Sequence, residues 1–144
     1  MAASDGVKHV GIVLVEIFGE RHPRLFWADN LVVNSGLEWI ADRLTSTPAV
    51  MSHMAAGSSG AGTEPTTSTL TTELQRVALT SVTGITRGTT YSALFGPGVA
   101  TGSIAELGIF NAGSGGTMLN RVVFPPETKG PKDSMRVTWT VTQY

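Results

Sequence analysis

The sequence predicts an all-β protein, a jelly-roll-like β-sandwich of about eight strands with one short helix. Two observations predict this class. Short runs rich in β-branched and aromatic residues recur about every ten residues between turns of Gly, Pro, Asn or Ser. Only one segment has apolar residues at helical spacing. A sandwich, a jelly roll and a small barrel all satisfy this pattern.

The chain has 144 residues, which indicates one domain. We expect a single β domain over residues 1–144, with residues 1–7 as an extended N-terminal arm. The chain contains no Cys, so it forms no disulfide and no thiolate metal site. This composition fits a protein made in a reducing cytosol.

The first third predicts two strands and the helix. Lys8–Phe18 is almost continuously apolar, so we expect a strand that is covered on both faces or lies centrally in its sheet. Arg24–Val33 resumes the strand pattern. Gly36–Leu44 has the helical spacing, and Asn34 and Ser35 before it offer an N-cap.

The middle third predicts strands on either side of a long loop. Val50–Ala56 reads as a short strand, and Gly57–Thr72 is a loop rich in Gly, Ser and Thr. Glu73–Thr83 fits a helix or a strand, and its alternation favours one strand. Thr89–Phe95 alternates through aromatic and small residues and ends at Gly-Pro-Gly.

The last third predicts three strands, Ser103–Phe110, Thr117–Phe124 and Ser134–Thr142. Gly113–Gly116 joins the first two, and its glycines suit the positive φ angles of a hairpin turn. The final strand alternates strictly, so we expect one of its faces to lie in the core. That face carries Met135, Val137, Trp139 and Val141.

The charge balance argues against nucleic acid as a partner. The chain has 10 basic and 11 acidic residues, a net charge of −1, and no basic stripe to neutralise phosphates. Residues 1–6 lack the basic and apolar regions of a signal peptide, and the longest apolar run is too short to span a bilayer. We therefore expect no direct nucleic-acid partner and no membrane.

No pattern in the sequence predicts catalysis. The three histidines, His9, His22 and His53, have no metal-ligand spacing. The Gly-Ser segments lack the spacing of a nucleophile elbow and the Lys of a phosphate-binding loop. We expect no catalytic residue, no metal and no cofactor.

One carboxylate is placed unusually. Glu106 lies among apolar residues, and an unpaired buried carboxylate is costly. We expect a structural ion pair with Arg121, which follows across the glycine hairpin, and Arg76 is a second candidate partner. The functional alternative is a general acid in a cleft.

Four segments resemble one protein family. NLVVNSGLEWIADRL (30–44), SHMAAGSSGAGTEPTTSTLTTELQRVALTS (52–81), YSALFGPGVATGSIAELGIFNAGSGGTMLNRVVFP (91–125) and KGPKDSMRVTWTVT (129–142) are similar to cement, or decoration, proteins of tailed-phage capsids. Related strings occur in tail-fibre and baseplate proteins. Residues 1–25 carry none of the resemblance.

The resemblance implies a non-enzymatic protein that sits outside a phage capsid and ties capsomers together. Its partners would be the major capsid protein and further copies of itself, as a homodimer or higher oligomer. It would be assembled in the host cytoplasm and reside on the virion. A tail-fibre or baseplate adaptor is the alternative, and a carbohydrate-binding β domain is the remote one.

We expect the particle contacts to come from the arm, the Thr-rich loop and the sheet edges. The arm and the loop have little to pack, so we expect one or both of them to order by lying on the shell or on a second copy. The candidate interaction loop comprises Ser58, Ser59, Thr63, Glu64, Thr66 and Thr67.

Overall fold

The computed structural model describes residues 9–19 and 23–143, and within them the predicted all-β fold with one helix is confirmed. The predicted N-terminal arm lies outside the described residues. The strands are β1 (His9–Phe18), β2 (Arg24–Val32), β3 (His53–Gly57), β4 (Glu73–Ala78), β5 (Ser81–Ile85), β6 (Gly88–Phe95), β7 (Gly102–Phe110), β8 (Met118–Lys129) and β9 (Ser134–Gln143). The helix is α1 (Asn34–Asp42).

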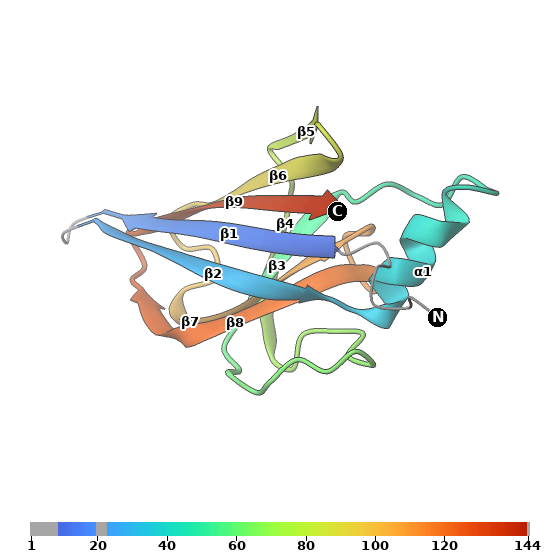
Figure 1. Ribbon diagram of the computed structural model, residues 1–144. Helices are drawn as coiled ribbons and strands as arrows, with labels where there is room; N and C mark the ends of the chain where they lie inside the picture. Colours follow the sequence, from blue (N-terminus) through green and yellow to red (C-terminus); the bar gives the residue numbers. More distant parts are fainter. Residues whose placement is uncertain (1–8, 20–22, 144) are drawn as a thin grey trace.

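The nine strands form one antiparallel sheet in the order β4-β3-β7-β8-β2-β1-β9-β6-β5. Strands β2 and β8 are joined by only two residue pairs, Leu31 with Arg121 and Val32 with Asn120. The sheet curls at this narrow junction, so the β2-β1-β9-β6-β5 half and the β8-β7-β3-β4 half lie across from each other (Figure 1). Four of the eight neighbouring pairs are consecutive strands, and the jelly-roll connectivity that we predicted is not confirmed.

Glu73–Thr83 was predicted as one strand, but the structure places two strands, β4 and β5, in this region. The described residues therefore form nine strands instead of the predicted eight or so. The chain changes partner between β4 and β5. Leu79 N–H donates to Ser52 C=O beside β3, and the next residue, Thr80, donates to Ser92 C=O on β6. Because consecutive residues bond to opposite halves of the sheet, the segment crosses from one half to the other.

Helix α1 begins earlier than its predicted N-cap. Val33 occupies the N-cap position in extended conformation and supplies no side-chain hydrogen bond. Asn34 and Ser35 lie inside the first turn, where Asn34 N–H donates to Pro65 C=O and Ser35 Oγ donates to Met118 C=O. The helix start is thus held by tertiary contacts. No helix in the described part of the chain is long and apolar enough to cross a membrane.

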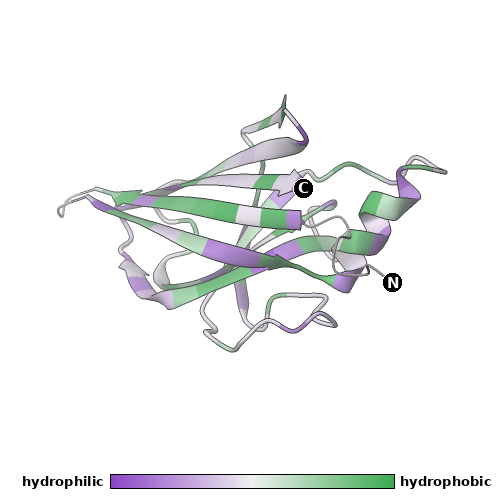
Figure 2. Ribbon diagram, in the orientation of Figure 1, coloured by the Kyte–Doolittle hydropathy of each residue, from purple (hydrophilic) through white to green (hydrophobic). Residues whose placement is uncertain are grey.

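The main core lies between the two halves of the sheet and receives side chains from both. The inward face predicted for β9 is confirmed, since Met135, Val137 and Trp139 are fully buried and Val141 nearly so. Strand β1 lies centrally, between β2 and β9, but only one of its faces is buried. Figure 2 shows β1 coloured as hydrophobic along most of its length, so its exposed face is also largely apolar.

A part-buried hydrogen bond ties β2 to β9 across β1. Trp139 Nε1 donates to Asn30 Oδ1 at 2.9 Å. Gly11 of β1 lies opposite Asn30 on β2 and opposite Val141 on β9, and a Cβ there would overlap the Asn30 carboxamide. The glycine therefore provides the space through which Asn30 reaches the indole.

Candidate interaction surfaces

The predicted ion pair between Glu106 and Arg121 is present and fully buried. Arg121 Nη2 lies 2.9 Å from Glu106 Oε1, and Arg121 Nε donates to the same oxygen at 3.0 Å. Neither side chain is exposed to solvent. The two residues are diagonal neighbours across the β7–β8 ladder, where Gly108 is the residue opposite Arg121. The carboxylate is thus paired with a cation, as its burial requires.

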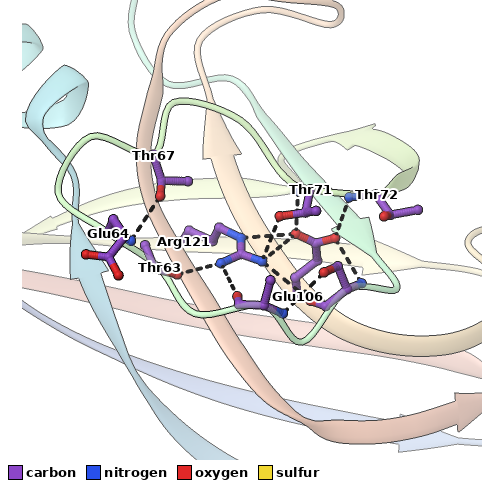
Figure 3. Close-up of polar contacts among 9 residues, drawn as sticks. Thr63, Glu64, Thr67, Thr71, Thr72, Glu106 and Arg121 are labelled. Carbon is purple, nitrogen blue, oxygen red and sulfur yellow. Dashed lines mark hydrogen bonds and ion pairs between the residues drawn. The ribbon is translucent and has the colours of Figure 1, made fainter.

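The long loop after β3 supplies the remaining partners of Glu106 (Figure 3). Oε2 accepts hydrogen bonds from the backbone N–H groups of Ser59 at 3.1 Å and Thr72 at 2.8 Å, and Oε1 accepts one from Thr71 N–H at 2.9 Å. The carboxylate therefore holds both ends of the loop through charge-assisted hydrogen bonds.

Arg121 binds the same loop with its remaining donors (Figure 3). Nη1 donates to Ala61 C=O at 2.8 Å and to Thr63 Oγ1 at 2.7 Å. The loop backbone and hydroxyls thus satisfy an arginine that solvent does not reach.

Of the predicted interaction loop, only part remains available for partners. Ser58, Ser59, Thr63 and Thr67 are half-buried, whereas residues 64–66 are exposed. Glu64 and Thr67 close a turn, in which Glu64 N–H donates to Thr67 Oγ1 at 2.9 Å and Thr67 N–H to Glu64 C=O at 3.0 Å. The expectation that the loop has little to pack against is wrong, because the buried ion pair fastens it to its own domain.

An apolar contact also fastens the loop. Leu70 is buried with Val33, Ala55, Phe110 and Met118 in a second small cluster. This cluster is separate from the main core between the sheet halves. The loop therefore covers apolar side chains as well as the ion pair.

Arg76, the second candidate partner of Glu106, has a different role. Its Nη2 pairs with Glu73 Oε1 at 2.8 Å, and its guanidinium lies 3.7 Å from the centroid of the Phe110 ring. Nη1 donates to the carbonyls of Ala112 and Gly115. Arg76 thus holds the β7–β8 hairpin through a cation–π contact and two hydrogen bonds to carbonyl groups. The sequence spacing did not indicate this role.

Lys129 is a second buried cation, and the sequence did not indicate its burial. Lys129 at the end of β8 has no exposed surface, and its Nζ donates to Gly96 C=O at 2.9 Å. Burial lowers the pKa of Lys129 below its ordinary value, against the opposing effect of the Asp133 carboxylate. A basic residue next to Gly and Pro gave no signal of burial.

The outer face of strands β1 and β2 exposes several large apolar side chains. We define the β1–β2 apolar face by five exposed residues, namely Val10, Ile12, Leu25, Trp27 and Leu31. Trp27 is 64% exposed and Leu25 is 60% exposed. The exposed Asp29 lies between Trp27 and Leu31, and Glu16 lies opposite Leu25, so the face also carries two carboxylates. A patch of several exposed apolar residues with polar residues around it indicates an interaction site.

A pocket of about 860 Å³ lies between α1, the chain that follows it, and strands β5 and β6. Its lining is mostly apolar and includes Trp39, Met51, Val82 and Tyr91. Burial raises the pKa of Tyr91 above 10.0, although a hydrogen bond from Thr89 and the charge of Arg43 lower it. The pocket has the size of a ligand site, and its polar lining residues are His9, Arg43, Thr89, Tyr91 and Gln143.

Within the described residues, no group of three or more His, Cys, Asp or Glu side chains could hold a metal ion. The general-acid alternative for Glu106 finds no support, because the carboxylate is saturated with hydrogen bonds and closed off from solvent. Comparison with protein-family models, curated proteins and solved structures finds no match to this chain.

Proposed function

We propose that this protein is a non-enzymatic virion structural protein, a cement or decoration protein that binds the outside of a tailed-phage capsid. Its partner is the major capsid protein, and it stabilises contacts between capsomers. The family resemblance of residues 30–44 and 52–142 suggests this role. The β1–β2 apolar face is the observation that carries it.

The composition of the β1–β2 apolar face suits a protein partner. Trp27 lies opposite Leu14, and Leu25 lies opposite Glu16, so the side chains of β1 and β2 form one surface. Aromatic and aliphatic residues are typical of the buried centre of protein interfaces, and Glu16 and Asp29 add two carboxylates to this face. Aromatic anchors such as Trp supply a large share of the binding free energy.

The anchored loop supplies a second, pre-ordered contact. Because Glu106 and Arg121 already fix its backbone, docking the exposed Glu64 and Thr66 on a shell requires little further ordering. Many copies on a repetitive shell then convert modest individual affinities into strong overall retention.

A reconstitution experiment tests the proposal. Capsids that lack the protein are mixed with purified protein, and binding is measured by co-sedimentation and capsid strength by the temperature of DNA release. We expect the wild-type protein to bind and to raise the release temperature. Trp27→Ser should weaken binding at least about tenfold, as expected for a buried aromatic anchor.

The matched control is Leu74→Ser on β4, which removes a similarly exposed apolar side chain from the other half of the sheet. We expect it to bind like the wild type. Equal weakening by both substitutions, or no binding of the wild-type protein, would contradict the proposal.

The tail-fibre or baseplate adaptor remains the second candidate, since the same apolar face would serve it. The carbohydrate-binding alternative requires a cleft with converging polar groups, and the mostly apolar pocket beside α1 does not favour it.

A further inference from the structure

Strand β5 is one of the two edges of the sheet and carries no protection against pairing. Its five residues, Ser81–Ile85, are all exposed and uncharged. The opposite edge, β4, carries Glu73 and Arg76. Natural proteins protect edge strands with charges, Pro or bulges, because a free edge is a template for another strand. Strand β5 is therefore the unprotected edge.

Backbone geometry makes this edge competent to pair. Within residues 9–19 and 23–143, strand β5 bonds only to β6, over five residue pairs from Ser81 with Ser92 to Ile85 with Gly88. In an antiparallel ladder the N–H and C=O groups of every second residue point away from the neighbouring strand. These groups of β5 face outward along the edge.

We infer that a second copy of this chain binds here, with the two β5 strands antiparallel about a two-fold axis at Thr83. Only this register pairs all five residues of both strands, because an axis at Val82 or Gly84 leaves residues unpaired. The sheet then continues without interruption from one protomer to its partner, as an isologous two-fold interface requires.

Side-chain volumes fit this register. In this register Val82 lies opposite the partner's Gly84. A Cβ at Gly84 would meet no atom within 4 Å, so the space beside this glycine can hold the valine side chain. Val82 and Gly84 both pair with β6 residues that line the pocket, Tyr91 and Thr89. The valine of each protomer therefore lies on the pocket side of the sheet, over the glycine of its partner.

The other face of the sheet supplies a row of threonines. Thr83 pairs with Thr90, and Thr90 pairs with Thr140, whose hydroxyl lies 3.1 Å from that of Thr90. The two-fold axis places Thr83 beside the partner's Thr83, so the row runs through the dimer. Cross-strand threonine pairs are favourable, and no like charges meet at this interface.

A ladder of five residues a side is short, so the dimer is weak in dilute solution. Stable interfaces bury roughly 1,000 Å² or more, and we expect a ladder of this length to bury less. High local concentration, as on a particle surface, favours it. The inference deepens the proposed function by naming the surface through which copies of the protein associate.

Disulfide trapping tests the register, because the chain has no native Cys. Thr83→Cys places two thiols beside each other at the axis, at a Cα separation of about 4.5–5.5 Å that suits a disulfide. Ser81→Cys is the matched control on the same strand and face. Its two Cα atoms lie about 14 Å apart, beyond the roughly 7 Å that a disulfide spans.

On mild oxidation of the full chain at high concentration, we expect Thr83→Cys to give covalent dimer and Ser81→Cys to remain monomeric. Equal cross-linking by both variants would overturn the register. Absence of cross-linking in Thr83→Cys, with its circular dichroism spectrum unchanged, would overturn the dimer.

Charge substitution gives a second, independent test. Thr83→Lys sets two lysines opposite each other at the axis, whereas Ser81→Lys adds the same charge opposite the partner's Ile85. We expect sedimentation equilibrium to show a larger loss of dimer for Thr83→Lys. Capsid binding is measured separately, so loss of one property without the other identifies which of the two proposals fails.

Discussion

Replacing Arg121 with methionine would leave the Glu106 carboxylate buried without a cation. The pair has 0% exposure on both sides and a separation of 2.9 Å, and breaking such a pair from one side costs about 3–5 kcal/mol. Two short loop contacts of Arg121, to Ala61 C=O and Thr63 Oγ1, are lost as well. We expect Arg121→Met to lower the free energy of unfolding by about 3–5 kcal/mol, a large share of the stability of an ordinary domain.

Urea unfolding at neutral pH, followed by tryptophan fluorescence, measures the loss. Hydrogen exchange locates it, because the amides of Ser59, Thr71 and Thr72 donate to Glu106 and should exchange faster in the variant. A loss below about 1 kcal/mol, the value of an exposed pair, together with unchanged exchange at these amides, would refute the reasoning.

The matched control is a partly exposed ion pair on the same sheet. Arg24 Nη1 lies 3.5 Å from Glu127 Oε2, and the two side chains are 27% and 35% exposed. Because solvent screens this pair, Glu127→Gln should cost less than about 1 kcal/mol. The difference between the two variants isolates the effect of burial.

Three further outcomes are expected. Gly11→Ala should push Asn30 away from the Trp139 indole and change the fluorescence of that tryptophan, and an unchanged spectrum would show that the glycine is dispensable. Because the pKa of Lys129 is lowered in the fold, the unfolded chain binds more protons between that lowered value and pH 10.5, so the stability of the wild type relative to Lys129→Met should rise with pH in that interval. Urea unfolding from neutral pH to pH 10.5 that gave a flat or falling difference throughout would contradict this. The raised pKa of Tyr91 predicts that the absorbance titration of the wild type minus that of Tyr91→Phe shows phenolate forming above pH 10.0, and a step at or below that pH would contradict it.

The fold class could be predicted from sequence because β-strand signals are local. The alternation of β9 places Met135, Val137 and Trp139 in the core from sequence alone, and the structure agrees. The split between β4 and β5 could not be predicted, because it depends on which half of the sheet each of Leu79 and Thr80 bonds to. That choice is a property of the tertiary fold.

The ion pair could be predicted because a charged residue lies within an apolar strand. Glu106 stood out in this way, and its hairpin spacing to Arg121 identified the partner. The loop was misjudged because composition indicated little packing, whereas its order comes from backbone N–H groups that any residue would supply. Backbone donors leave no signal in a sequence.

Copy number in purified virions tests the proposed function most directly. Quantitative mass spectrometry with a labelled peptide of this chain, calibrated against the major capsid protein, gives the number of copies per particle. A cement protein that repeats over the shell predicts tens to hundreds of copies. A handful of copies would favour the baseplate or fibre alternative, and absence from the particle would contradict the proposal.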